Sequence, residues 1–386
     1  MLSRNIKLEN FKNKNILKKL KAYYKNLIDK KNDKKNLINT FTKSYSYSYN
    51  KQQLKKYKKF DMFQIFGMGG SSLGSQAIYN FIKSKIKKKF YFFDNLDTKE
   101  NLIKSKNKIL NIIISKSGNT LETIVNENIF SGKNKLFITE NRDNYLRKQA
   151  FKLKSEIIEH KNFIGGRYSV LSEVGMLPAE LMGLKSKNFR QFNSLIKNRR
   201  FLNSLITNVG SILYYIKKRK FNSIIINYDE KSESLFKWYQ QLVAESLGKK
   251  KKGLLPIVSN MPKDNHSVMQ LYLDGFQNNF YTFFYVDEKK SKKLNNKIIL
   301  PSHKFLKNKS ISKIIYSQKK ASENIFLKKN IPFRSFEVKK RDEKTLGELF
   351  SFFILETILL GKALKLNPYD QPAVELIKKE TKKILT

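Results

Sequence analysis

The clearest indication of the fold class is the stretch Met62-Phe63-Gln64-Ile65-Phe66-Gly67-Met68-Gly69-Gly70-Ser71-Ser72-Leu73-Gly74. Its first part, Met62–Phe66, has the length and the apolar composition of a strand buried in a sheet. The strand leads directly into glycines and serines, and a helix is predicted over Leu73–Ile86. A strand, a glycine-rich turn and a helix in this order are typical of the first unit of a parallel α/β sheet.

The same alternation continues after this stretch. The sequence predicts further strands at Phe90–Phe93, Leu110–Ile114 and Leu136–Ile138, and helices that begin near Thr98, Thr120 and Asp143. A mostly helical stretch then runs from Val170 to Ile216. A second set of strands is predicted at Ser223–Ile226, Leu254–Val258, Tyr281–Val286 and Phe333–Val338, and two helices, Thr345–Leu364 and Gln371–Ile384, close the chain.

Two successive α/β sets predict two similar domains, each a mostly parallel sheet with helices on both faces. We divide the chain into a polar, partly helical segment 1–60, a first sheet domain 61–200 with a helical connection, a second sheet domain 201–342 and C-terminal helices 343–386. The alternating serines and tyrosines of Tyr45–Tyr49 are predicted to form a loop or a short edge segment.

Composition excludes several classes of site. The chain of 386 residues has no cysteine, so disulfides and thiolate chemistry are excluded. Its histidines, His160, His266 and His303, lie too far apart in sequence for a metal-ligand motif, and no metal is expected. The first residues are charged and the most apolar stretch, Leu349–Leu360, is too short to span a bilayer, so we expect a cytoplasmic protein without a membrane partner.

The net charge of +46 would by itself favour a nucleic-acid partner. The basic residues are spread along the whole chain, however, and do not interleave with a nucleic-acid motif. We attribute the charge to a compositional bias and expect no specific nucleic-acid partner.

The loop after Met62–Phe66 has the composition of a phosphate-binding turn. Gly69 and Gly70 let the backbone approach an anion, and Ser71 adds a hydroxyl donor. The helix that follows presents free N–H groups and the positive end of its dipole to the same place. Ser72 stands where a dinucleotide-binding motif has its third glycine, and the Walker lysine is absent, so a nucleotide is not expected.

A second polar loop follows the predicted strand Leu110–Ile114. Its residues, Ser115-Lys116-Ser117-Gly118-Asn119-Thr120, supply three hydroxyls and one ammonium. The carboxyl ends of parallel strands meet at one edge of a sheet, and ligands bind there. Two such loops predict a site for the phosphate of a small sugar.

Six blocks of sequence, in order along residues 67–378, resemble the phosphoglucose isomerase family. They are Gly67–Gly74, Ser115–Thr123, Gly165-Gly166-Arg167-Tyr168-Ser169, Glu245-Ser246-Leu247-Gly248-Lys249, His266–Gly275 and Tyr369-Asp370-Gln371-Pro372-Ala373-Val374-Glu375-Leu376-Ile377-Lys378. The chain departs from the family at Leu247, where a polar residue is common, and at Ala373, where glycine is frequent. Its short N-terminal region resembles that of compact bacterial members.

The resemblance implies two sugar-isomerase (SIS) domains and a glycolytic and gluconeogenic glucose-6-phosphate isomerase that acts as a homodimer with shared active sites and needs no cofactor. It assigns the phosphate to Gly70, Ser71, Ser115, Lys116, Ser117 and Thr120. It makes Glu245 the base and places Arg167 beside the reacting carbons. His266, from the neighbouring subunit, would open the sugar ring, and Gln371 and Lys378 would line the sugar, with Lys378 assisting catalysis.

These residue types suit the chemistry. Isomerisation moves a hydrogen between C2 and C1 through a cis-enediol, and one carboxylate on one face, Glu245, suffices to lift and return the proton. Arg167 supplies positive charge for the enediolate oxygen. A neutral imidazole can accept a proton on one ring nitrogen and donate one from the other, which suits His266 for proton transfer during ring opening.

Alternatives remain open at this stage. Without the resemblance, Glu245 is a solvated carboxylate near a helix end, His266 a cap or core residue, and Lys378 one of many lysines on a charged helix. The chain could also be a sugar-phosphate sensor that has lost catalysis, or a related SIS isomerase acting on an amino sugar or on mannose phosphate. A nucleic-acid binder rests on charge alone.

Overall fold

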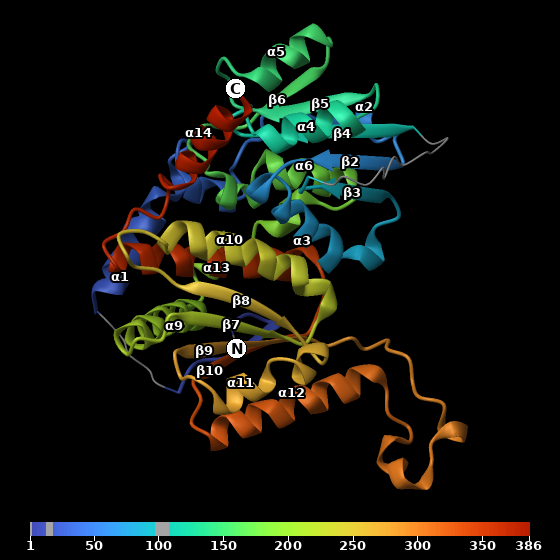
Figure 1. The fold of residues 1–386 in the computed structure, drawn as a ribbon, viewed down its shortest axis with the longest axis vertical. Helices are drawn as coiled ribbons and strands as arrows, with labels where there is room; N and C mark the ends of the chain where they lie inside the picture. The colour runs from blue at the N-terminus through green and yellow to red at the C-terminus, as the bar shows by residue number, and fades with distance from the viewer. Residues whose placement is uncertain (1, 13–17, 97–107) are drawn as a thin grey trace.

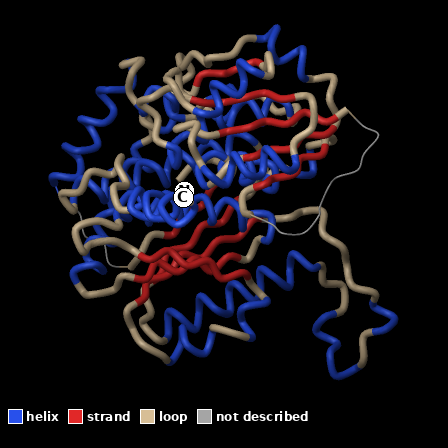
Figure 2. Tube along the Cα trace, turned by 45° about the horizontal axis from the view of Figure 1, so that its top comes forward, coloured by secondary structure: helices blue, strands red, loops and turns tan. Residues whose placement is uncertain are grey.

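The computed structural model describes residues 2–12, 18–96 and 108–386 and contains two separate five-stranded sheets. Figure 1 shows the sheets one above the other, with helices α10 (Glu233–Leu247) and α13 (Glu343–Ala363) between them. The tube in Figure 2 shows the same two groups of strands with helices packed around each. The predicted fold class, two mostly parallel sheets flanked by helices, is confirmed.

The first sheet is parallel throughout and has the order β3-β2-β4-β5-β6. Its strands are β2 (Met62–Phe66), β3 (Lys89–Phe93), β4 (Ile109–Ile114), β5 (Lys135–Thr139) and β6 (Glu156–Glu159). The first four agree with the predicted strands to within one residue at each end. Strand β6 was missed because its sequence, Glu-Ile-Ile-Glu, is short and charged at both ends.

The second sheet has the order β1-β10-β9-β7-β8. Its strands are β1 (Ile6–Glu9), β7 (Asn222–Asn227), β8 (Leu255–Asn260), β9 (Asn279–Val286) and β10 (Phe333–Val338). Four strands are parallel, and β1 pairs antiparallel with β10. If β1 is counted last, both sheets place their strands in the order 2-1-3-4-5, so the two domains are similar in topology as predicted.

Helices cover both sheets and connect their strands. The α-helices of the described residues are α1 (Lys18–Asp29), α2 (Lys51–Tyr57), α3 (Leu73–Phe81), α4 (Leu121–Phe130), α5 (Tyr145–Lys152), α6 (Glu173–Leu181), α7 (Ser186–Phe189), α8 (Phe192–Leu195), α9 (Arg199–Lys217), α10, α11 (Met269–Asp274), α12 (Ile311–Lys328), α13 and α14 (Val374–Leu385). The helix predicted near Thr98 lies outside the described residues.

One predicted helix is shorter in the structure, and one predicted helical stretch is divided into several helices. The helix predicted over Leu73–Ile86 ends at Phe81, and a 3₁₀ turn, Lys83–Lys85, follows it. The stretch Val170–Ile216 is mostly helical as predicted and divides into α6, α7, α8 and α9. Gly183, at φ +89°, follows the end of α6.

The N-terminal segment is integrated into the fold. Strand β1 extends the second sheet, and Tyr45 and Tyr49 are buried in the core. The Tyr45 hydroxyl donates to the buried carboxylate of Glu173 at 2.9 Å, which ties this segment to α6.

The largest hydrophobic cluster contains Phe63 of the first sheet and Phe284 of the second, so the two sheets share one core. The predicted domain boundaries stay a prediction.

Across 2–12, 18–96 and 108–386, no helix is long and apolar enough to cross a membrane. Within the same ranges, no group of three or more His, Asp or Glu side chains is arranged to hold a metal ion.

Candidate active site

The guanidinium of Arg167 lies at the junction of the two domains and is almost fully buried. It belongs to a 3₁₀ turn, Gly166–Leu171, that precedes α6. A guanidinium has five N–H donors, and each of them has an acceptor here. The acceptors, with their distances, are Ser246 Oγ at 2.9 Å, Glu245 Oε2 at 2.9 Å, Gln371 Oε1 at 2.8 Å, the Pro368 carbonyl at 2.8 Å and the Asp370 carbonyl at 2.9 Å.

Glu245 stands near the end of α10, and its carboxylate is divided between two partners. Oε2 accepts from Nη1 of Arg167, and Oε1 accepts from Nε2 of Gln241 at 2.9 Å. The side chain remains 29% exposed, so one face is open to a ligand. It borders a cavity of about 580 Å³ that Gln371 also lines. A base held by its neighbours yet open to solvent on one side can reach a substrate proton.

The glycine-rich loop after β2 touches this site through its backbone. A methyl group built on Gly70 would lie 2.2 Å from the carbonyl of Gly166 and 2.6 Å from the Arg167 nitrogen. A methyl group built on Gly69 would lie 2.6 Å from Nε2 of Gln241. The first predicted phosphate loop therefore lies directly against the residues that hold Arg167 and Glu245.

The second predicted loop joins β4 to α4 and gathers its hydroxyls. Ser115 Oγ lies 2.8 Å from Thr120 Oγ1 and 3.5 Å from Ser117 Oγ. Thr120 is the N-cap of α4, yet its side chain makes no capping bond, so the first N–H groups of the helix stay available to an anion. Gly118 takes φ +67°, and Asn144 fills the place where a side chain would stand, so the turn requires glycine.

The ammonium of Lys116 has local partners. Nζ donates to the carbonyl of Asn162 at 2.8 Å and forms an ion pair with Glu140 at 3.3 Å. The side chain is 31% exposed. It belongs to the predicted loop, and its side-chain torsions would have to change before Nζ could contact an anion beside the hydroxyls.

Burial shifts two pKa values close to the site. The pKa of the Tyr168 hydroxyl is raised chiefly because the side chain is removed from water. Burial also lowers the pKa of His160 to about 4, so this ring is neutral at physiological pH. His160 follows β6 and lies close enough to Lys116 to sense its charge. Both side chains are therefore neutral at physiological pH.

Residues 6–261 match the family model described as phosphoglucose isomerase. A glucose-6-phosphate isomerase of Methanocaldococcus jannaschii is 34% identical over 352 residues, which cover 85% of this chain and 86% of that protein. The chain belongs to the phosphoglucose isomerase family. The predicted family is confirmed, and with it the predicted class of enzyme, a glucose-6-phosphate isomerase.

Two solved structures support the fold of this phosphoglucose isomerase family member. A hypothetical protein of Thermus thermophilus aligns with a TM-score of 0.82 at 21% identity, covering 95% of this chain and 94% of its own. A glucose-6-phosphate isomerase of Chlamydia trachomatis aligns with a TM-score of 0.69 at 19% identity, covering 86% of this chain and 71% of its own.

The structure does not bring every residue that the family resemblance assigns to one place within a single chain. Glu245 lies in α10, which starts after the carboxyl end of β7 and leads back to the amino end of β8. His266 follows the carboxyl end of β8. A strand of six residues is about 20 Å long, so His266 and Glu245 of one chain lie at opposite edges of the sheet.

Lys378 lies on the exposed helix α14 and pairs with Glu375 at 2.7 Å. It does not line the cavity beside Glu245, although Gln371, seven residues earlier, does. The residues that one chain assembles are thus Arg167, Glu245 and Gln371, together with the loop at Gly70.

Sequence analysis missed Gln241 as a member of the site. Its Nε2 holds Glu245, and its Oε1 is buried and has no hydrogen-bond partner among the described residues. A buried orphan acceptor beside a base indicates a place for a ligand hydroxyl. The signal was present in the sequence, because residues four apart share one face of a helix.

Proposed function

We propose that this phosphoglucose isomerase family member interconverts glucose 6-phosphate and fructose 6-phosphate by proton transfer through a cis-enediol, with Glu245 as the base. One observation supports this most strongly. Arg167 binds Glu245 and Gln371 through the same nitrogen, Nη1, at the edge of a cavity large enough for a sugar. The base and the positive charge that the enediolate needs are therefore neighbours before substrate binds.

The proton transfer follows from this arrangement. Substrate entering beside Glu245 would take over the hydrogen bonds that Nη1 makes in the free enzyme. Glu245 then lifts the proton from C2, and Nη1 stabilises the negative charge that develops on O1. The O2 hydroxyl proton passes to O1, and the same carboxylate returns its proton to C1, which leaves the carbonyl on C2. Gln241 keeps the carboxylate oriented through Oε1 of Glu245, and its own free Oε1 accepts from a sugar hydroxyl.

The phosphate belongs at the carboxyl edge of the first sheet. Ser71 follows β2, and Ser115, Ser117 and Thr120 follow the adjacent strand β4. The hydroxyls and the uncapped N-terminus of α4 all donate toward an anion placed there. The ammonium of Lys116 would attract the phosphate once its ion pair with Glu140 is broken.

We further propose that His266 acts in the site of a second copy of the chain, so that the active form is a homodimer. The opposite positions of His266 and Glu245 on the second sheet support this. So does the arm 288–310, which projects from the body in Figure 1 and exposes Ile298, Leu300 and Phe305. Exposed apolar side chains on a projecting arm are expected to be covered by a partner. Lys378 on exposed α14 would join the shared site, and a glycolytic role in the cytoplasm stays a prediction.

The role of Glu245 is tested by Glu245→Gln, with Glu233→Gln in the first turn of the same helix as the matched control. Loss of the base should lower kcat by roughly 10²–10⁴-fold and leave binding of fructose 6-phosphate largely intact. Both variants are assayed for conversion of fructose 6-phosphate with a coupled dehydrogenase. Full turnover by Glu245→Gln, or none by the unmodified protein, would refute the proposal.

The shared site is tested by mixing two inactive variants, Glu245→Gln and His266→Ala. Mixed dimers would contain one site with both changes and one intact site, so roughly a quarter of the activity should return after subunit exchange. Activity that stays absent in mixtures shown to exchange subunits would place both residues in one chain's site.

A further inference from the structure

The five donors of Arg167 fall into two groups. The Nη1 group faces Glu245 and Gln371, the side chains of the site. The Nε and Nη2 groups donate to Ser246 Oγ and to the carbonyls of Pro368 and Asp370. The second group holds the guanidinium and leaves the first to act on a ligand.

Two hydroxyls close the second group into a ring. Tyr168 Oη lies 2.7 Å from Ser246 Oγ and donates to the carbonyl of Pro368 at 2.9 Å. The same carbonyl accepts from Nη2 of Arg167 at 2.8 Å. Arg167, Ser246, Tyr168 and Pro368 therefore form one closed circuit of hydrogen bonds.

The direction of every bond in this circuit is fixed by chemistry. A guanidinium can only donate and a carbonyl can only accept. Ser246 therefore accepts from Arg167 and gives its own proton to Tyr168, which gives its proton to Pro368. Burial adds rigidity, because Ser246 and Tyr168 are 0% exposed and no water competes for these bonds.

We propose that Ser246 and Tyr168 are positioning residues for isomerisation: their ring fixes the plane of Arg167 so that Nη1 meets the developing enediolate. The inference rests on the proposed function, because it assigns Arg167 to that oxygen. Preorganised donors contribute to catalysis only when they are already aimed at the charge that forms in the transition state. Loss of the ring should therefore weaken transition-state binding more than substrate binding.

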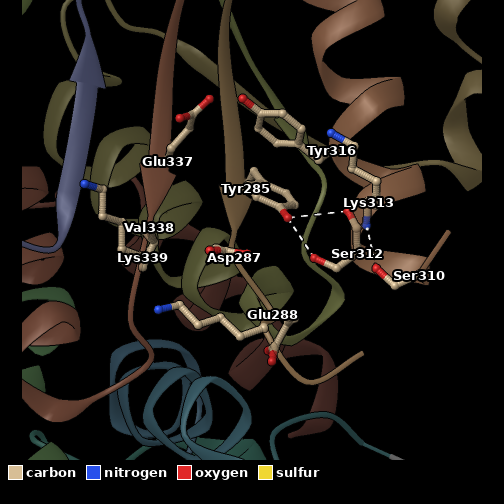
Figure 3. A pocket seen from close by; sticks show the side chains of 11 residues that line it. Tyr285, Asp287, Glu288, Ser310, Ser312, Lys313, Tyr316, Glu337, Val338 and Lys339 are labelled. Atoms are coloured by element: carbon tan, nitrogen blue, oxygen red, sulfur yellow. Dashed lines mark hydrogen bonds between the residues drawn. The ribbon is translucent and has the colours of Figure 1, made fainter. Parts of the chain in front are cut away.

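The test compares Tyr168→Phe with Tyr285→Phe. Tyr285 offers a matched control, because its hydroxyl is also buried and lies 2.8 Å from a serine, Ser312, in the second sheet domain (Figure 3). It lies beside a separate cavity at the ends of β9 and β10. Both variants lose the same buried tyrosine–serine bond, so a purely structural effect should be similar in the two.

For Tyr168→Phe we expect kcat to fall roughly tenfold while the KM for fructose 6-phosphate stays within about twofold. The inhibition constant of arabinonate 5-phosphate, whose carboxylate resembles the enediolate, should rise in parallel with the loss of kcat. Ser246→Ala should behave alike, and Ser246→Thr, which keeps the hydroxyl, should recover most of the activity. Tyr285→Phe should keep the kcat and the inhibition constant of the unmodified enzyme.

Three results would overturn the inference. Tyr168→Phe could keep a kcat within twofold of the unmodified enzyme, or raise KM with an unchanged kcat. Tyr285→Phe could lose as much kcat as Tyr168→Phe. Each of these leaves the proposed function standing, because the unmodified enzyme is active in all three. An inactive unmodified enzyme would instead remove the proposed function and this inference together.

Discussion

Replacing Gly70 by alanine should disable the enzyme without removing any functional group. The added methyl would lie 2.2 Å from the Gly166 carbonyl, whereas ordinary contact starts at 3.4 Å. The two backbones must therefore separate by about 1.2 Å, because neither neighbour is a flexible side chain. A misplacement of about 1 Å in an active site can cost roughly 100-fold in rate. We expect kcat to fall by about that factor, together with a loss of roughly 1–3 kcal/mol in stability from overpacking.

The assay is the coupled conversion of fructose 6-phosphate, with urea unfolding of the same preparations. Gly132→Ala serves as the control, because a methyl there meets only Asn111 at 3.6 Å, an ordinary contact. It should change kcat less than twofold, by the same reasoning. If folded Gly70→Ala protein converted fructose 6-phosphate at the rate of the control, the tight contact between the glycine loop and the Arg167 turn would not be needed to position the active-site residues.

Two further predictions concern stability. Burial lowers the pKa of His160 to about 4 from an ordinary 6.5. Between these two pH values the unfolded chain binds a proton on this ring, whereas the folded chain does not. The free energy of unfolding should therefore decrease by about 3 kcal/mol as the pH falls from about 6.5 to about 4. His160→Gln should remove this part of the pH dependence in urea titrations. Equal dependence of the unfolding free energy on pH in the two proteins would contradict the prediction. Glu356→Gln leaves the fully buried Arg334 without its anionic partner, and the free energy of unfolding should fall by about 3–5 kcal/mol. Most of this loss should be recovered when Arg334 is also changed to Met. A loss below about 1 kcal/mol would show that the pair is not buried in solution.

The succession of strands along the chain was predictable because it depends on patterns within short stretches of sequence. Apolar runs such as Met62–Phe66 and Phe333–Val338 match the observed strands at both ends. Strand β1 was not predictable in the same way. Its four residues alternate apolar and charged side chains within a lysine-rich segment, and only pairing with β10, over 320 residues later, gives it a place.

The amino-acid pattern was enough to predict that two loops of glycine and hydroxyl residues, each at the end of a strand, would meet at one edge of a parallel sheet. That follows from the period of the apolar residues and from the turns that glycine allows. The hydrogen bonds that hold Arg167 could not be predicted in this way. Two of its acceptors, Pro368 and Asp370, offer backbone carbonyls, and every residue has a carbonyl. Which of them lies beside a buried guanidinium is set by how distant segments pack.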